Sequence, residues 1–184
     1  MDNLFICFHV FLLLFIFLAG GLNKIANFQD TANYLESKVN EIQLNPIFIA
    51  AIIITIIYFY VIIVLRTNNM YLFVLISVAI ACIPFLAYFK KYLNRGKALV
   101  SFIYDAAIAG VIGLLIFGSL LILYSLYTNK YQEYAYVATI GLAVFTAMTI
   151  LIFHFPTNKS ETISFTKNLS IFGGLMLLSQ RFVE

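Results

Sequence analysis

Four side chains that can carry charge stand near the ends of four different apolar segments: Lys24, Asp105, His154 and Lys167, with Asn168 beside the last of them. An ionised carboxylate in hydrocarbon costs several kcal/mol. Asp105 should therefore face the interior of a helix bundle and either pair with Lys24 or Lys167 or hold a proton. Histidine is the residue type that most readily exchanges a proton near neutral pH. We expect these groups to gather around a polar cavity on one side of a membrane domain.

Two kinds of chemistry fit a histidine, a carboxylate and a cation around such a cavity. The first is binding of a quinone-type ring, in which His154 or a lysine donates a hydrogen bond to a carbonyl oxygen and Asp105 relays protons. The second is structural: an ion pair locks the helices together and His154 lies at the membrane interface. The residues by themselves favour the structural role, because buried ion pairs often contribute fold specificity rather than net stability.

Other kinds of functional site have little support in the sequence. His9 and His154 fall on opposite faces of the predicted membrane domain, so they cannot ligate one haem. The sequence has no phosphate-binding loop, HExxH motif, Cys-x-x-Cys pair or plausible catalytic triad, and we assign neither a metal site nor catalytic residues. The net charge of +3 is too small to indicate nucleic-acid binding.

The elements that must position these side chains are transmembrane helices. The 184 residues are 63% hydrophobic and 10% charged, whereas soluble domains are about 45–50% apolar and about 25% charged. Runs of about 20 apolar residues are long enough to cross a bilayer. Such runs, or nearly such runs, occupy 4–22, 47–65, 70–89, 99–126, 134–155 and 168–180. The sequence predicts an all-α, multi-pass transmembrane helix bundle of about six spans, within a single membrane domain over 1–184.

The distribution of lysine and arginine predicts the orientation of this bundle. With six spans, the connections 23–45, 90–97 and 156–167 share one face, which carries eight of the 11 basic residues, and the other face carries three. This asymmetry places both termini on the non-cytoplasmic side, or away from the matrix in a mitochondrion. We therefore expect the bacterial inner membrane or the mitochondrial inner membrane as the location.

The stretch 28–44 differs from the long apolar runs. Its apolar residues recur at helical spacing, and polar residues fall between them. The apolar set is Phe28, Ala32, Leu35, Val39 and Ile42, and the polar set is Asp30, Asn33, Glu36, Lys38 and Glu41. This pattern predicts an amphipathic helix that lies on the membrane surface or over the helix bundle.

Three stretches carry a resemblance to a known family. They are "FIFLAGGLNKIANFQDTANYLESK" near the N-terminus, "YDAAIAGVIGLLIFG" in the middle and "FHFPTNKSETISFTKNLSIFGGLMLL" near the C-terminus. In this order they resemble the first helix, second core helix and ending of the DoxX family of small membrane proteins. The matching positions are Lys24, Asp105, His154, Lys167, Asn168, Gly173 and Gly174, with Asp105 standing where Glu is more usual.

The resemblance implies how the domain is built. The parts 1–44 and 99–184 resemble the four-helix core of the family, and 46–95 is an additional transmembrane hairpin. Two added spans leave the orientation of the later helices unchanged, as expected of an insertion.

The resemblance also implies a function, because DoxX-like proteins are associated with quinone-linked redox at membranes. On this hypothesis His154, Lys167, Asp105, Lys24 and Asn168 bind a quinone or a phospholipid. No flavin, haem or metal motif would supply electrons, so we favour a non-catalytic membrane subunit over a stand-alone oxidoreductase.

The alternative is a structural accessory subunit of a larger, respiratory-type membrane complex, with the hairpin as its docking element. In either case we expect membrane lipid and other integral membrane subunits as partners. A transporter is a weaker hypothesis, since the sequence shows no convincing repeat.

Overall fold

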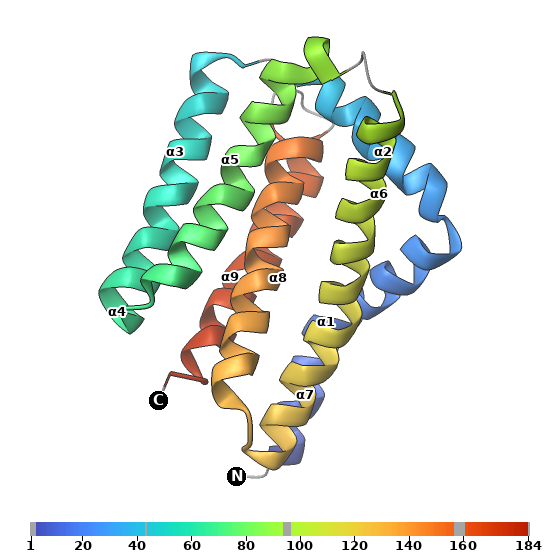
Figure 1. Cartoon of the computed structure of the whole chain (residues 1–184). Coiled ribbons are helices and arrows are strands. Elements are labelled where there is room, and N and C mark those ends of the chain that lie inside the picture. The colour runs from blue at the N-terminus through green and yellow to red at the C-terminus, as the bar shows by residue number, and fades with distance from the viewer. Residues whose placement is uncertain (1–2, 43, 94–96, 157–160, 184) are drawn as a thin grey trace.

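The computed structural model describes residues 3–42, 44–93, 97–156 and 161–183, and within these ranges all regular structure is helical. The described chain forms seven helices, of which two contain a π-helical turn. Figure 1 shows their arrangement. The first helices are α1 (Asn3–Ala26), α2 (Phe28–Glu41) and α3 (Pro46–Phe59), which continues through the π-helical turn η1 (Tyr60–Val64) into α4 (Leu65–Thr67). The others are α5 (Met70–Leu93), α6 (Lys97–Gly113) continuing through η2 (Leu114–Gly118) into α7 (Ser119–Thr128), α8 (Gln132–Phe153) and α9 (Thr162–Gln180). The all-α prediction is confirmed.

Four of these helices are long and apolar enough to cross a membrane, with 19 to 28 residues each. They are Leu4–Ala26, Pro46–Val64, Ser101–Thr128 and Gln132–Phe153. The chain thus has the features of a multi-pass integral membrane protein with about four clear spans, rather than the six expected. For α9 the difference has a physical reason, because its first half carries Thr166, Lys167, Asn168 and Ser170.

Helix α8 lies at the centre of the bundle and packs against α9, α7, η2, α5, α3 and α2 (Figure 1). Small residues recur along it, including Ala135, Ala138, Ala143 and Ala147, all buried. Small side chains allow helix backbones to approach closely, which is the main route to packing where hydrocarbon surrounds the helices. The composition of α8 therefore explains its central position.

The turn η2 fits between two glycines of neighbouring helices. A Cβ atom on Gly21 of α1 would lie 2.7 Å from Cγ1 of Ile116, and one on Gly141 of α8 would lie 3.0 Å from Cδ1 of Leu114. Both distances are shorter than ordinary van der Waals contact. The π-helical turn thus brings two of its side chains against α1 and α8 where these helices have no side chain.

Asparagines define several helix ends. The Asn45 side chain accepts a hydrogen bond from the backbone N–H of Phe48 at 2.8 Å, and Pro46 occupies the first turn of α3. Asn68 and Asn129 adopt positive φ angles of 52° and 56° after α4 and α7, a conformation that asparagine tolerates better than most residues. These residues stop the apolar helices at the turns between them.

The amphipathic stretch expected over 28–44 is helical as α2, from Phe28 to Glu41. Its apolar face rests on α6, where Ala32 and Val39 are buried in a small cluster with Tyr104 and Ile108. Helix α2 therefore lies over the bundle, and contact with a membrane surface stays a prediction.

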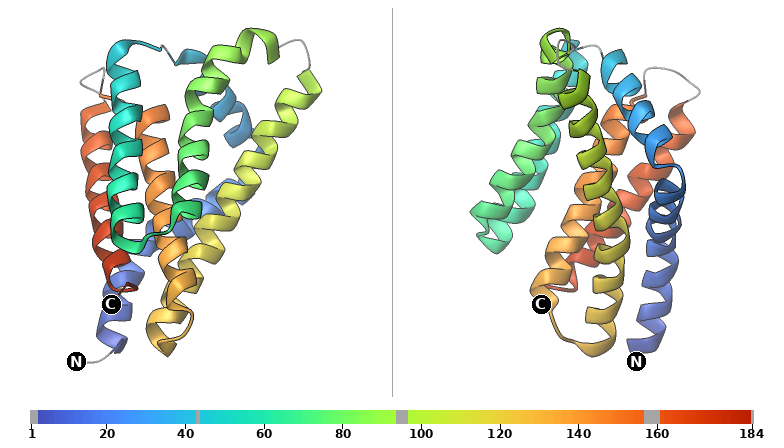
Figure 2. Two further views of the ribbon diagram at one scale, coloured as in Figure 1. Left: turned by 60° about the vertical axis from the view of Figure 1, so that its left-hand side comes forward. Right: turned by 45° about the vertical axis from the view of Figure 1, so that its right-hand side comes forward.

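Both chain ends lie at one end of the bundle, together with the turn between α7 and α8 (Figure 1). The opposite end is formed by α2, the beginning of α3 and the C-terminal end of α8. The pair formed by α3–α4 and α5 corresponds to the hairpin expected over 46–95, of which 94–95 lie outside the described residues. In the right-hand view of Figure 2 this pair leans away from the other helices.

Candidate functional site

A pocket of about 380 Å³ opens at the end of the bundle opposite the chain termini. Its polar lining comes from Lys38 and Glu41 at the end of α2, Asn45 before α3 and Glu161 before α9. Its apolar lining comes from α2, α3, the end of α8 and Phe155, and includes Phe48, Phe153 and Leu151. We call it the end pocket. Its volume falls within the range of about 300–1,000 Å³ typical of small-molecule sites.

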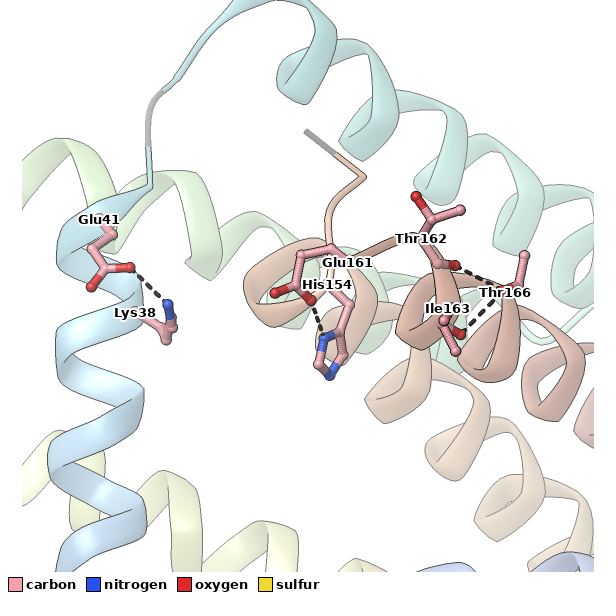
Figure 3. A network of polar contacts seen from close by, with 7 residues as sticks. All are labelled: Lys38, Glu41, His154, Glu161, Thr162, Ile163 and Thr166. Atoms are coloured by element: carbon pink, nitrogen blue, oxygen red, sulfur yellow. Dashed lines mark hydrogen bonds and ion pairs between the residues drawn. The ribbon is translucent and has the colours of Figure 1, made fainter. Parts of the chain in front are cut away.

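The α2 side of the end pocket carries an ion pair. Lys38 and Glu41 lie one helical turn apart, and the Lys38 Nζ donates to Glu41 Oε2 at 2.8 Å (Figure 3). This hydrogen bond raises the pKa of Lys38 and lowers the pKa of Glu41 from their ordinary values. Both side chains are partly exposed, by 30% and 60%, so the pair is accessible to a ligand.

A second pair lies on the opposite side of the end pocket. The Nδ1 of His154 and the Oε2 of Glu161 are 2.9 Å apart, with 30% and 37% of the two side chains exposed. His154 ends α8, and Pro156 cannot continue the helix because it lacks a backbone N–H. The negative charge of Glu161 also contributes to raising the pKa of Lys38. Glu161 is therefore close enough to Lys38 to interact with it electrostatically (Figure 3).

Aromatic rings form the wall beneath these charges. Phe48 is buried and packs edge-on against Phe155, with ring centroids 5.5 Å apart. Phe153 stacks on Tyr34 of α2 at 5.5 Å with an interplanar angle of 20°. Asn45 Oδ1 accepts the hydrogen bond from Phe48. The amide nitrogen of Asn45 has no partner within the described ranges, so it can donate a hydrogen bond to a ligand. The pocket therefore combines hydrogen-bond donors and carboxylates with aromatic and aliphatic side chains.

The structure places the five sequence-predicted site residues in separate surroundings. His154 is paired with Glu161 beside the end pocket. Lys24 and Asn168 both line a second, smaller pocket of about 130 Å³ between α1, η2, α8 and α9. Lys167 is exposed on α9, and Asp105 lies on α6. Neither of these two pockets is lined by all five residues, and their sharing of one ligand site stays a prediction.

The expected ion pair of Asp105 with Lys24 or Lys167 is also wrong. Asp105 Oδ1 is buried and has no hydrogen-bond partner in the part of the chain that the structure describes. Helix α6 packs on α1, α2 and α5, whereas α9, which carries Lys167, packs mainly on α8. Asp105 and Lys167 were expected at similar depths in the membrane, but the helices that carry them pack against different neighbours in the bundle.

Sequence reasoning missed Lys38, Glu41 and Glu161 as members of the site. Glu161 had a usable signal, since it stands seven residues after His154 across a connection that contains Pro156. A short connection between antiparallel helices returns its two flanks to the same place. Lys38 and Glu41 show the i, i+3 spacing of a helical ion pair, but nothing in the sequence places α2 against the end of α8.

No protein-family model, curated protein or solved structure matches this chain. The similarity to the DoxX family therefore rests on the three sequence stretches alone. Within the described residues, no three His, Cys, Asp or Glu side chains gather closely enough to hold a metal ion.

Proposed function

We propose that this chain is a DoxX-like multi-pass membrane subunit that binds an amphiphile of the quinone type in the end pocket. One observation carries the proposal: charged and amide groups form the rim of a pocket of about 380 Å³ whose wall is aromatic. A quinone ring has the same division, with carbonyl oxygens at its edge and an apolar face.

The named side chains would have distinct roles in such a complex. The ammonium of Lys38 and the amide of Asn45 are donors for carbonyl oxygens, and Phe48 contributes to the apolar wall. The His154–Glu161 pair lies on the other side of the pocket from Lys38. Electrons would have to come from a partner protein, so the chain acts as a quinone-binding subunit rather than as an oxidoreductase by itself.

The same proposal includes six membrane crossings, formed by a DoxX-like four-helix core and the α3–α5 hairpin. Both chain ends lie at one end of the bundle (Figure 1), as an even number of crossings such as six would place them. The exposed tyrosines Tyr124, Tyr127, Tyr131 and Tyr134 at that end suit a membrane interface, where tyrosine is enriched. A bacterial or mitochondrial inner membrane is the proposed location.

Titration of the protein with a short-chain benzoquinone in mild detergent tests this function. The chain has 12 tyrosines and no tryptophan, so binding can be followed by tyrosine fluorescence quenching and by the melting temperature. We expect saturable binding that weakens by roughly tenfold in Lys38→Gln, as for loss of one charged hydrogen bond. Lys130→Gln, at the opposite end of the bundle, is the control. Absence of saturable binding, or equal behaviour of the two variants, would contradict the proposal.

The accessory-subunit function is a second candidate because the α3–α5 hairpin leans away from the bundle (Figure 2). Its exposed apolar side chains include Ile53, Ile57, Val74 and Val78. In a membrane, this surface can meet a neighbouring subunit as well as lipid. Val78→Trp should then abolish co-isolation of a specific subunit from native membranes without lowering the melting temperature, whereas Phe117→Trp on η2 should not.

A further inference from the structure

The smaller pocket, of about 130 Å³, lies between α1, η2, α8 and α9. Its walls are mostly apolar and include Phe17, Leu115 and Ile171. Ile16, which is 44% exposed, also lines it, so the pocket is reached from the outer surface of the bundle. We call it the α1–α9 slot. It is too small for a whole amphiphile and suits part of a single chain.

Two hydrogen-bond donors line this apolar slot without an acceptor. Lys24, in the last turn of α1, forms no ion pair or hydrogen bond among the described residues, and the side chain of Asn168 forms none either. The hydroxyls of Thr146 and Thr149, which also line the slot, donate to carbonyls of their own helix at 2.8 and 2.9 Å. Lys24 and Asn168 can therefore donate hydrogen bonds to a ligand in the slot, and a negatively charged acceptor would suit the Lys24 ammonium best.

Lys24 has a simpler role that must be compared with ligand binding. A cation in the last turn of a helix interacts favourably with the helix dipole. That interaction explains a lysine at the end of α1, but it leaves the half-buried ammonium without a hydrogen-bond acceptor and does not involve Asn168. An ammonium taken partly out of water is costly unless it is paired.

We infer that the α1–α9 slot binds an anionic membrane lipid. Part of one acyl chain would occupy the slot along Phe17 and Ile171, and an anionic oxygen of the headgroup would accept hydrogen bonds from Lys24 and Asn168. This site is separate from the end pocket, so the inference does not depend on quinone binding. The open side of the slot at Ile16 lets the rest of the lipid lie against the outer surface of the bundle.

The test uses the full chain in mild detergent, observed by native mass spectrometry and thermal melting. The probes are phosphatidylglycerol, phosphatidylcholine with the same acyl chains, and inorganic phosphate. We expect one phosphatidylglycerol to bind in preference to phosphatidylcholine and to raise the melting temperature. In Lys24→Gln the preference should fall roughly tenfold or more, as for loss of a charged hydrogen bond, while Lys24→Arg and the control Lys130→Gln should retain it.

A second variant keeps the inference testable if Lys24→Gln does not fold. Gly20 lines the slot, and a Cβ atom there would meet nothing within 4 Å. Gly20→Leu should therefore fill the slot and abolish the bound lipid without a steric clash at the backbone. Equal binding of both lipids, a preference that survives Lys24→Gln or Gly20→Leu, or full stabilisation by inorganic phosphate alone would overturn the inference.

Discussion

His154 Nδ1 lies 2.9 Å from Glu161 Oε2, so the residue that ends α8 is bonded to the residue that precedes α9. These two helices form the most extensive contact in the bundle. The bond fixes the two flanks of their connection at the rim of the end pocket. Because α8 ends just before Pro156, His154 can turn toward Glu161 and help to shape the candidate site.

Removing this bond should lower stability by a modest amount. Glu161→Ala is expected to reduce the free energy of unfolding by about 0.5–1 kcal/mol, because both side chains are about one-third exposed and such pairs are weak. Glu133→Ala is the matched control, since Glu133 is also an acidic residue at a helix N-terminus but makes no ion pair in the described chain. Equal losses in the two variants, measured by reversible unfolding in detergent, would show that only the helix dipole is involved.

The Lys38–Glu41 pair predicts a specific dependence on pH. The hydrogen bond with Lys38 lowers the pKa of Glu41 below its ordinary value of 4.5, so its contribution to stability is present above that value and is lost as the pH falls through the lowered pKa. The hydrogen bond with Glu41 raises the pKa of Lys38 above 10.5, so its contribution is present below that value and is lost as the pH rises through the raised pKa. The pair should be intact at every pH between these limits.

Side-chain NMR titration of labelled glutamate and lysine checks this pH dependence. In Lys38→Met the titration of Glu41 should move back toward higher pH, because the main cause of its lowered pKa is removed. Ser37→Ala should produce a smaller change, since Ser37 is the weakest contributor, with a hydrogen bond of 3.4 Å. An unchanged Glu41 titration in Lys38→Met would refute the assignment.

Asp105 should behave as a destabilising residue. Its Oδ1 is buried and has no hydrogen-bond partner in the described chain, and an unsatisfied buried polar group costs about 1–3 kcal/mol. We expect Asp105→Ala, which removes the unsatisfied polar group, to raise the free energy of unfolding by about 1 kcal/mol. Asp30→Ala on the exposed face of α2 is the control. A clear loss of stability in Asp105→Ala would instead indicate a partner for the carboxylate, as the sequence first led us to expect.

The contact between α1 and η2 predicts different outcomes at two adjacent glycines. Gly21→Ala should destabilise the protein by about 1–3 kcal/mol, as in other overpacked cores, because its new Cβ would lie 2.7 Å from Ile116 Cγ1. Gly20→Ala meets no atom within 4 Å and should be neutral or slightly stabilising, since alanine favours helix by up to about 1 kcal/mol over glycine. Similar melting temperatures for both variants would mean that α1 does not pack on η2 as described.

The sequence predicted the helices well because helix formation in apolar segments depends on local composition. The runs around 4–22 and 134–155 correspond to α1 and α8, and the polar stretch before Met70 separates two helices. The partners of individual polar side chains were predicted poorly. Asp105 and Lys167 stand at similar depths, yet which face of each helix meets the bundle depends on packing around α8, and only Glu161 was close enough along the chain to be inferred as the partner of His154.

The π-helical turn η2 also limits how the length of this chain can change in evolution. A π-helical turn holds about one residue more than the α-helical turn it replaces, and each residue turns an α-helix by about 100°. Deleting one residue within Leu114–Gly118 would therefore convert the turn to an ordinary α-helical one and leave the buried face of α7, which carries Ser119, Ile122 and Ser125, in register. The same deletion in the regular part of α6 or α7 would rotate the residues after it by about 100°. Losses of single residues from this helix should therefore be tolerated at η2 and be selected against elsewhere in it.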